Sequence, residues 1–174
     1  MRLEIAAQAF ATKHHAAIGQ VRKYTGEPYI THPAAVVELV RSVPHTEVML
    51  AAAWLHDTVE DTTATLTDIY EAFGKDVAQM VEMLTDISIP GLGNRAQRKA
   101  MDHEHTALAS PEAKTVKLAD LIDNTRSIVA RDPKFARIYL QEKQLLLQVL
   151  REGDSTLWQV AFQLADPMGA PHAG

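Results

Sequence analysis

The segment LHDTVED, residues 55–61, gathers four ionisable side chains directly after the most apolar run of the chain. A helix here would stack His56 over Glu60 and Asp57 over Asp61, because positions i and i+4 share a helix face. Three carboxylates and an imidazole at the end of a buried helix are costly unless something compensates their charge. A divalent cation would do so. The alternative interpretation is a solvated helix end with a capping role.

Two other segments offer the further ligands that a metal ion needs. His32 directly precedes Pro33 at the start of an expected helix, and Asp120 lies in the segment VKLADLIDN. Lys117, Asp120 and Asn124 form a polar stripe about 100° from the apolar stripe of their helix, which either faces water or lines a buried site. Two His and two Asp without a thiolate suit Mn²⁺ or Fe²⁺ with open water positions better than a closed structural zinc.

Four segments, in this order and spacing, resemble the HD-domain metal-dependent phosphohydrolases, and within them the stand-alone small alarmone hydrolases among the RelA/SpoT homologues. The segments are GQVRKYTGEPYITHP (19–33), AAAWLHDTVEDT (51–62), AFG followed by a helix ending in LTD (72–86), and KTVKLADLIDNTRS (114–127). A lone His-Asp pair is weak evidence, whereas four ordered motifs are specific.

The resemblance implies a role for twelve residues of this chain. It implies that four residues hold a Mn²⁺ ion, namely His32, His56, Asp57 and Asp120. It implies that Glu60 and Asp61 are the acidic pair that positions and deprotonates the attacking water. The implied substrate contacts are Arg22 and Lys23 at the base and its phosphates, Arg98 and Lys99 facing the diphosphate, Asn124 at the sugar, and Tyr139 at the far end of the pocket.

The activity that the resemblance implies is a Mn²⁺-dependent pyrophosphohydrolase of the stringent response, which removes the 3′-diphosphate from (p)ppGpp to give GDP or GTP. The same chemistry on (p)ppApp, or removal of a phosphate from NADPH, is an open alternative. A non-catalytic nucleotide sensor is a second one, although it predicts the loss of a ligand or acidic residue. The chain ends where the synthetase domain of long family members would begin, so we expect degradation without synthesis. Asp123 directly precedes Asn124, the implied sugar contact. Its carboxylate would there either repel a phosphate of the substrate or bond one of its hydroxyl groups.

Helices must position these residues, because the apolar spacing is helical and strict strand alternation is missing. We expect an all-α, single HD-domain bundle of eight to nine helices over residues 1–166, with a flexible tail at 167–174. Ser110-Pro111 and Asp132-Pro133 each predict an N-cap followed by proline at the first helical position. The expected helices lie near 2–17, 33–43, 46–60, 66–73, 75–86, 94–108, 111–130 and 133–151, with a last one near 154–166.

Composition narrows the possible partners. The chain has 17 Lys plus Arg against 22 Asp plus Glu, a net charge of −5, which argues against a nucleic-acid coat. It has no Cys, so disulfides and thiolate zinc sites are excluded. No apolar run is long enough to cross a membrane and the first residues do not resemble a signal peptide, so we expect a cytoplasmic protein. The apolar run LLLQVL at 145–150 makes a homodimer a further expectation.

Overall fold

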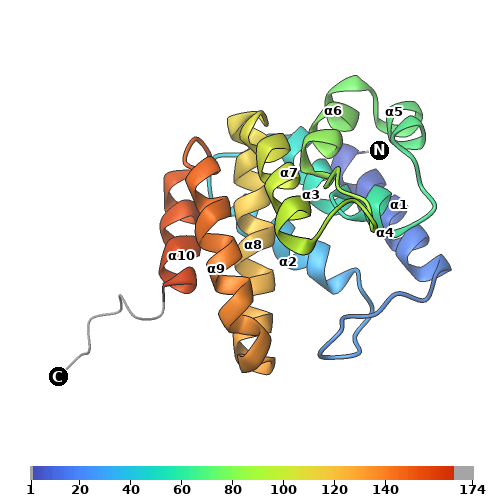
Figure 1. Ribbon diagram of the computed structural model, residues 1–174. Coiled ribbons are helices and arrows are strands. Elements are labelled where there is room, and N and C mark those ends of the chain that lie inside the picture. The colour runs from blue at the N-terminus through green and yellow to red at the C-terminus, as the bar shows by residue number, and fades with distance from the viewer. Residues whose placement is uncertain (1, 167–174) are drawn as a thin grey trace.

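The computed structural model describes residues 2–166, and nearly all of its regular structure is helical (Figure 1). Within this range one isolated antiparallel bridge pairs Val21 with Pro28. The predicted all-α class is therefore confirmed. The helices are α1 (Leu3–Ala17), α2 (Thr31–Arg41), α3 (Glu47–Leu55), α4 (Thr58–Asp61), α5 (Leu66–Phe73), α6 (Lys75–Leu84), α7 (Arg95–Ala107), α8 (Pro111–Arg131), α9 (Pro133–Val149) and α10 (Ser155–Ala165).

Side-chain caps begin most of these helices. Ser110 accepts a hydrogen bond from the backbone N–H of Ala113 at the start of α8, and Asp132 accepts one from Phe135 at the start of α9. In both helices a proline follows the cap, as the sequence predicts. Both long helices that form the C-terminal half are thus fixed at their N-termini by local sequence.

The predicted continuous helix near 46–60 is wrong, because the chain forms two helices there. α3 ends at Leu55 and α4 begins at Thr58, so that His56 and Asp57 lie at a break. The His56 Nδ1 atom donates to the carbonyl oxygen of Ala53, 2.8 Å away, at the end of α3. This break raises the count to ten helices in residues 2–166 and turns both side chains toward the interior.

Helix α8 is the central element that holds the site. It packs against α2, α3 and α6 on one side and against α9 and α10 on the other, and Figure 1 shows it in the middle of the molecule. Its apolar residues Leu118, Leu121 and Ile122 are buried together with the apolar residues 49–55 of α3. Asp120 on α8 therefore lies beside His32 of α2 and His56 of the α3–α4 break.

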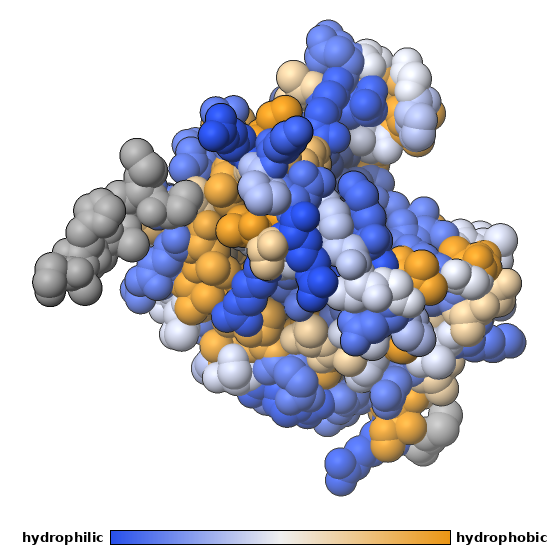
Figure 2. Space-filling view, turned by 90° about the horizontal axis from the view of Figure 1, so that it is seen from below, coloured by the Kyte–Doolittle hydropathy of each residue, from blue (hydrophilic) through white to orange (hydrophobic). Residues whose placement is uncertain are grey.

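The surface carries mixed polar and apolar side chains. Figure 2 shows apolar residues gathered on the side where α9 and α10 lie, where Ile138, Leu145 and Phe162 are exposed. Among the described residues, no helix combines the length and the hydropathy that a membrane crossing requires. The segment 167–174, predicted to be a flexible tail, lies outside the described residues.

Candidate metal and nucleotide site

The four predicted metal ligands meet where α2, α8 and the α3–α4 break come together. The Nε2 atoms of His32 and His56 lie 3.3 Å apart. Asp57 Oδ2 lies 3.5 Å from the first and 3.1 Å from the second, and Asp120 Oδ1 lies 3.1 and 3.6 Å from them. The ligand atoms of His32, His56 and Asp57 all lie within 4.8 Å of one another. Residues from three distant segments thus converge on one point.

Hydrogen bonds on the outer side of each ring set the orientation of both imidazoles. His32 Nδ1 lies 2.6 Å from Asp123 Oδ2, and His56 Nδ1 lies 2.8 Å from the carbonyl oxygen of Ala53. An ionised carboxylate and a carbonyl only accept hydrogen bonds, so each Nδ1 carries the hydrogen. In the neutral form of each ring, Nε2 therefore presents its lone pair to the centre, which is the arrangement that metal-ligating histidines need.

The electrostatics of this cluster are those of opposite charges in close contact. Burial opposes the shift, but Asp57 and Asp120 raise the pKa of His56 well above its usual value. Asp120 and Asp123 likewise raise the pKa of His32 against its burial. In turn, the imidazoles hold the pKa values of Asp57 and Asp120 low although both carboxylates are desolvated. In the protein alone, protons carry the positive charge that these carboxylates attract.

The donor set fits a divalent cation. Ligands about 2.1 Å from one ion are about 3.0–3.5 Å apart at neighbouring positions, and the five distances given above span 3.1–3.6 Å. The two imidazole nitrogens and two carboxylate oxygens form a mixed set without sulfur. His32 and His56 are almost completely buried, so the site is preformed and not assembled from mobile surface side chains.

The acidic pair Glu60 and Asp61 lies on α4, directly after the metal cluster. Glu60 Oε2 accepts a hydrogen bond from the backbone N–H of Asp86, 3.2 Å away. Its residue is exposed overall, but partial burial of its carboxyl group and the charge of Asp86 raise its pKa to about 7. Burial also raises the pKa of Asp61. Glu60 is thus suited to accepting a proton near neutral pH, and Asp61 is a stronger base than an ordinary aspartate.

Sequence reasoning missed three residues that hold this pair and the ligands. Gln20 donates from Nε2 to Asp61 Oδ2 over 2.8 Å, and its Oε1 lies 2.6 Å from His15 Nδ1. The hydroxyl of Tyr29 donates to Asp57 Oδ2 over 2.5 Å. His15, Gln20 and Tyr29 precede the HD segment by more than twenty residues, and no local spacing connects them with it.

Lysines form one wall beside the cluster. Lys117 Nζ lies 3.6 Å from Asp86 Oδ1 and 3.8 Å from Asp120 Oδ2, and Lys99 Nζ lies 3.3 Å from Asp86 Oδ2. Asp86 therefore anchors both ammonium groups next to the metal ligands. The predicted Arg98 donates instead to the carbonyl oxygen of Gly93, 2.8 Å away. Within residues 2–166, no ion pair or hydrogen bond joins Arg98 to the other predicted site residues.

The predicted base contacts border a hollow of about 210 Å³. Arg22 and Lys23 line it together with Asn124 and three aromatic residues, Tyr24, Tyr29 and Phe135. Lys23 Nζ lies 5.0 Å from the ring centre of Tyr24 and 5.8 Å from that of Phe135, within cation–π range. The aromatic share of this wall was not predicted, since Phe135 comes from α9, far along the chain.

Asn124 connects this hollow to the metal cluster, and Tyr139 lies behind the hollow next to Phe135. Asn124 Nδ2 donates to Asp120 Oδ1 over 2.6 Å. Tyr139 is buried on α9, with its ring centre 6.0 Å from that of Phe135. Burial raises the pKa of Tyr139, so its hydroxyl stays protonated at neutral pH. Eleven of the twelve predicted residues therefore border one continuous region between α2, α4, α7, α8 and α9.

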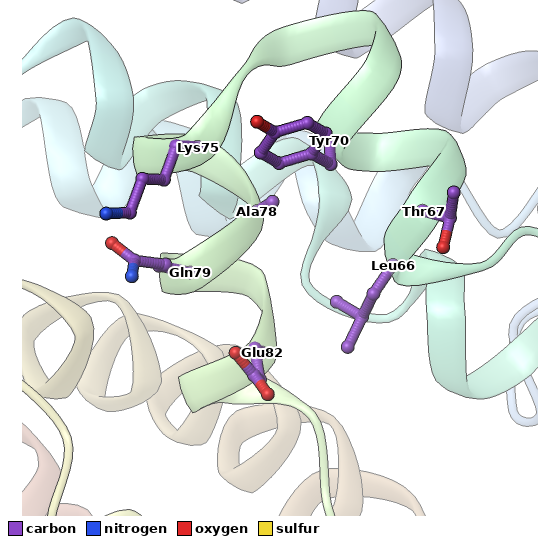
Figure 3. Close-up of a pocket in the computed structure, with 7 residues that line it drawn as sticks. All are labelled: Leu66, Thr67, Tyr70, Lys75, Ala78, Gln79 and Glu82. Carbon is purple, nitrogen blue, oxygen red and sulfur yellow. The ribbon is translucent and has the colours of Figure 1, made fainter.

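Another hollow, of about 580 Å³, lies elsewhere, between α5 and α6 (Figure 3). Figure 3 shows Leu66, Thr67 and Tyr70 on α5 opposite Lys75, Gln79 and Glu82 on α6. None of the predicted site residues lines it, and it has no cluster of metal-ligating groups. The metal cluster and its neighbouring hollow are the candidate functional site.

Comparison with known proteins agrees with this geometry. A family model described as HD domain matches residues 7–151. The chain belongs to the HD domain family. A solved structure described as "A metazoan ortholog of SpoT hydrolyzes ppGpp and plays a role in starvation responses" superposes with a TM-score of 0.85 at 29% sequence identity, covering 97% of each chain. The expected resemblance in fold is thus confirmed over nearly the whole chain.

Curated relatives of the chain are also similar to it in sequence. A probable guanosine-3′,5′-bis(diphosphate) 3′-pyrophosphohydrolase of Synechocystis is 34% identical over 160 residues, which cover 90% of this chain and 20% of the relative. The corresponding Aquifex aeolicus enzyme is 32% identical over 164 residues, covering 92% and 22%. The bifunctional (p)ppGpp synthase/hydrolase SpoT of Escherichia coli is 33% identical over 138 residues, covering 78% and 20%. The chain spans about a fifth of the length of these relatives.

Proposed function

We propose that this HD domain is a Mn²⁺-dependent pyrophosphohydrolase that releases the 3′-diphosphate of (p)ppGpp. The observation that carries the proposal is the convergence of His32, His56, Asp57 and Asp120 beside an acidic pair and a lysine wall. The family relationship supports it, because similar proteins are named for this activity.

The proposed metal ligands are the two Nε2 atoms and one carboxylate oxygen each from Asp57 and Asp120. The chemistry supplied by a divalent cation at this position is activation of water near neutral pH and polarisation of a phosphoryl oxygen. Mn²⁺ is the ion we propose, because an N/O ligand set without sulfur accommodates it with open water positions. Tyr29 and Asn124 hold the two carboxylates in place by donating to Asp57 and Asp120.

Glu60 and Asp61 are the groups we propose to hold the attacking water and to take its proton. The Asp86 N–H fixes Glu60 and the Gln20 amide fixes Asp61, so both carboxylates are oriented before substrate binds. Their raised pKa values make each a stronger base than an ordinary carboxylate. Either one can serve as the general base with the other as its hydrogen-bonding partner.

Cationic and aromatic groups complete the proposed substrate site. Lys99 and the neighbouring Lys117 bind the diphosphate, whose negative charge increases as it leaves. Arg22 and Lys23, with the rings of Tyr24 and Phe135, hold the base and its phosphates in the 210 Å³ hollow. Asn124 contacts the sugar, and Tyr139 closes the far end.

A comparison of substrates tests this proposal. Protein loaded with Mn²⁺ is incubated separately with ppGpp, ppApp and NADPH, and the products are separated by chromatography. We expect GDP and diphosphate from ppGpp as the fastest reaction. Faster turnover of ppApp or NADPH would keep the chemistry and reassign the substrate, whereas no turnover of any of the three would refute the enzymatic function.

The exposed apolar residues on α9 and α10, Ile138, Leu145 and Phe162, support the further proposal of a homodimer. We also propose that the protein acts in the cytoplasm, where its nucleotide substrate is made. Light scattering coupled to size-exclusion chromatography tests the dimer. A mass of 19.2 kDa, that of a single chain, would exclude it under the conditions used.

A further inference from the structure

One carboxylate oxygen of Asp123 joins a metal ligand to a nucleotide contact. Asp123 Oδ2 accepts a hydrogen bond from His32 Nδ1 over 2.6 Å and another from Arg22 over 2.9 Å. The Asp123 side chain is only 21% exposed, and that of His32 is completely buried. Charge-assisted hydrogen bonds of this length in a partly desolvated site are strong and directional.

The spacing of Asp120 and Asp123 on α8 explains how the His32 ring is held. Residues at i and i+3 lie on one helix face about 5–6 Å apart, close to the span that an imidazole bridges. Asp120 Oδ1 lies 3.1 Å from Nε2, whereas Asp123 Oδ2 lies 2.6 Å from Nδ1. One ring is thus clamped between two carboxylates of the same helix, one on each nitrogen.

The two histidines are oriented by different kinds of acceptor. His56 uses the backbone carbonyl of Ala53, which no side-chain substitution removes. His32 depends on the side chain of Asp123, which also holds the guanidinium of Arg22. Substituting Asp123 therefore releases one ligand while leaving the other ligand and its support unchanged.

We propose that Asp123 is a positioning residue, which keeps His32 in the metal-binding tautomer and ties Arg22 of the nucleotide pocket to it. Asp123 is not a ligand, because it contacts the nitrogen on the outer side of the ring. This proposal rests on the proposed function for the identity of the metal site. The carboxylate of Asp123 thus contacts His32 and Arg22 of the protein itself. The sequence left open whether it would meet a phosphate or a hydroxyl of the substrate.

Binding of Mn²⁺ alone, measured by isothermal titration calorimetry on metal-free protein, tests the proposal without using activity. Loss of an orienting carboxylate typically weakens metal binding 10–100-fold. We expect Asp123→Asn to raise the dissociation constant for Mn²⁺ at least tenfold in 0.5 M as well as 0.05 M NaCl, because screening removes through-space charge effects but not a hydrogen bond. Asp123→Glu restores part of the affinity.

Two further variants serve as controls. Glu112→Gln removes a carboxylate from the exposed first turn of α8 and leaves Mn²⁺ binding unchanged. Arg22→Gln weakens nucleotide binding but keeps the Mn²⁺ affinity within threefold, because His32 retains Asp123. If Asp123→Asn does not fold, Asp123→Glu carries the test with an intermediate loss of affinity.

Three results would contradict the proposal. The first is a folded Asp123→Asn protein whose Mn²⁺ affinity stays within threefold of wild type. The second is a loss of Mn²⁺ affinity in Glu112→Gln equal to that in Asp123→Asn. The third applies if Asp123→Asn does not fold, and is a folded Asp123→Glu protein that binds Mn²⁺ with wild-type affinity. Each would refute the role of Asp123 while leaving the proposed hydrolase intact. A wild-type protein that binds no Mn²⁺ would overturn both.

Discussion

We predict that the partly buried charge of Lys143 on α9 lowers the stability of the folded protein and strengthens nucleotide binding. Its ammonium lies 4.8 Å from the ring centre of Tyr139 and forms no ion pair with a carboxylate in residues 2–166. Burial and the charges of Lys117 and Lys99 lower its pKa from 10.5 to about 8. The folded protein therefore holds a positive charge that it disfavours. Because Lys143 is near Lys99 and Lys117, we expect its charge to contribute to binding of the proposed diphosphate.

The structure sets the size of the effect. Each pKa unit corresponds to about 1.4 kcal/mol, so the lowered pKa of Lys143 represents at most about 3.5 kcal/mol. Partial exposure of the side chain reduces this to roughly 2 kcal/mol. The pKa is lowered on folding, so the penalty is complete below pH 8 and disappears as the pH rises toward 10.5.

Substitution of Lys143 by Met therefore stabilises the protein at neutral pH. We expect urea denaturation at pH 7 to show a free energy of unfolding about 2 kcal/mol above wild type, a gain that falls below about 1 kcal/mol at pH 10. The melting temperature at pH 7 rises by about 4–8 °C. In the activity assay the same variant loses affinity for the nucleotide.

Lys134→Met is the matched control, because it removes an exposed lysine from the first turn of the same helix. We expect its stability to stay within about 0.5 kcal/mol of wild type at both pH values. A Lys143→Met protein less stable than wild type at pH 7, or equally stabilised at pH 10, would refute the reasoning.

Three further predictions concern the base, the core and the metal. The pKa of Glu60 is raised to about 7, so we expect the hydrolysis rate to increase with pH through this region. The substitution Asp86→Asn removes a repelling charge and moves this increase to lower pH. A pH–rate profile unchanged by Asp86→Asn would contradict the prediction. Leu118→Ala leaves a cavity at a fully buried position on α8, and we expect it to lower the free energy of unfolding in urea by about 2–5 kcal/mol. The control Leu108→Ala, at an 86% exposed position, lowers it by less than about 0.5 kcal/mol. Equal decreases in the two variants would be inconsistent with the fold. Mn²⁺ at a thousand times its dissociation constant stabilises the wild type by about 4 kcal/mol in thermal melts, and chelation or His56→Ala removes this gain; a gain retained by His56→Ala would place the metal elsewhere.

The sequence predicts most of the helices because their signals are local. Ser110 and Asp132 cap α8 and α9 through their own side chains, and the apolar stripe of α8 follows from spacing within the helix. The break between α3 and α4 was missed; it falls at His56 and Asp57, where the His56 ring bonds the carbonyl oxygen of Ala53. Helical periodicity does not carry that information.

The candidate site is predictable to the extent that its motifs are contiguous. His56 and Asp57 are adjacent, and both His32 and Asp120 stand in segments with their own patterns. The supporting contacts are different, since His15, Gln20 and Asp61 join α1 and the following loop to α4, and Phe135 reaches the hollow from α9. These contacts arise only when helices distant in sequence pack together, so the spacing of residues in the sequence does not predict them.

Restoration of activity by Mn²⁺ tests the central claim most directly. Metal-free wild-type protein, His56→Ala and the control His45→Ala, which changes an exposed histidine, are each incubated with ppGpp before and after Mn²⁺ is added. We predict that Mn²⁺ restores release of diphosphate and GDP in wild type and His45→Ala, and not in His56→Ala. Equal turnover without metal, or by His56→Ala with metal, would contradict the account.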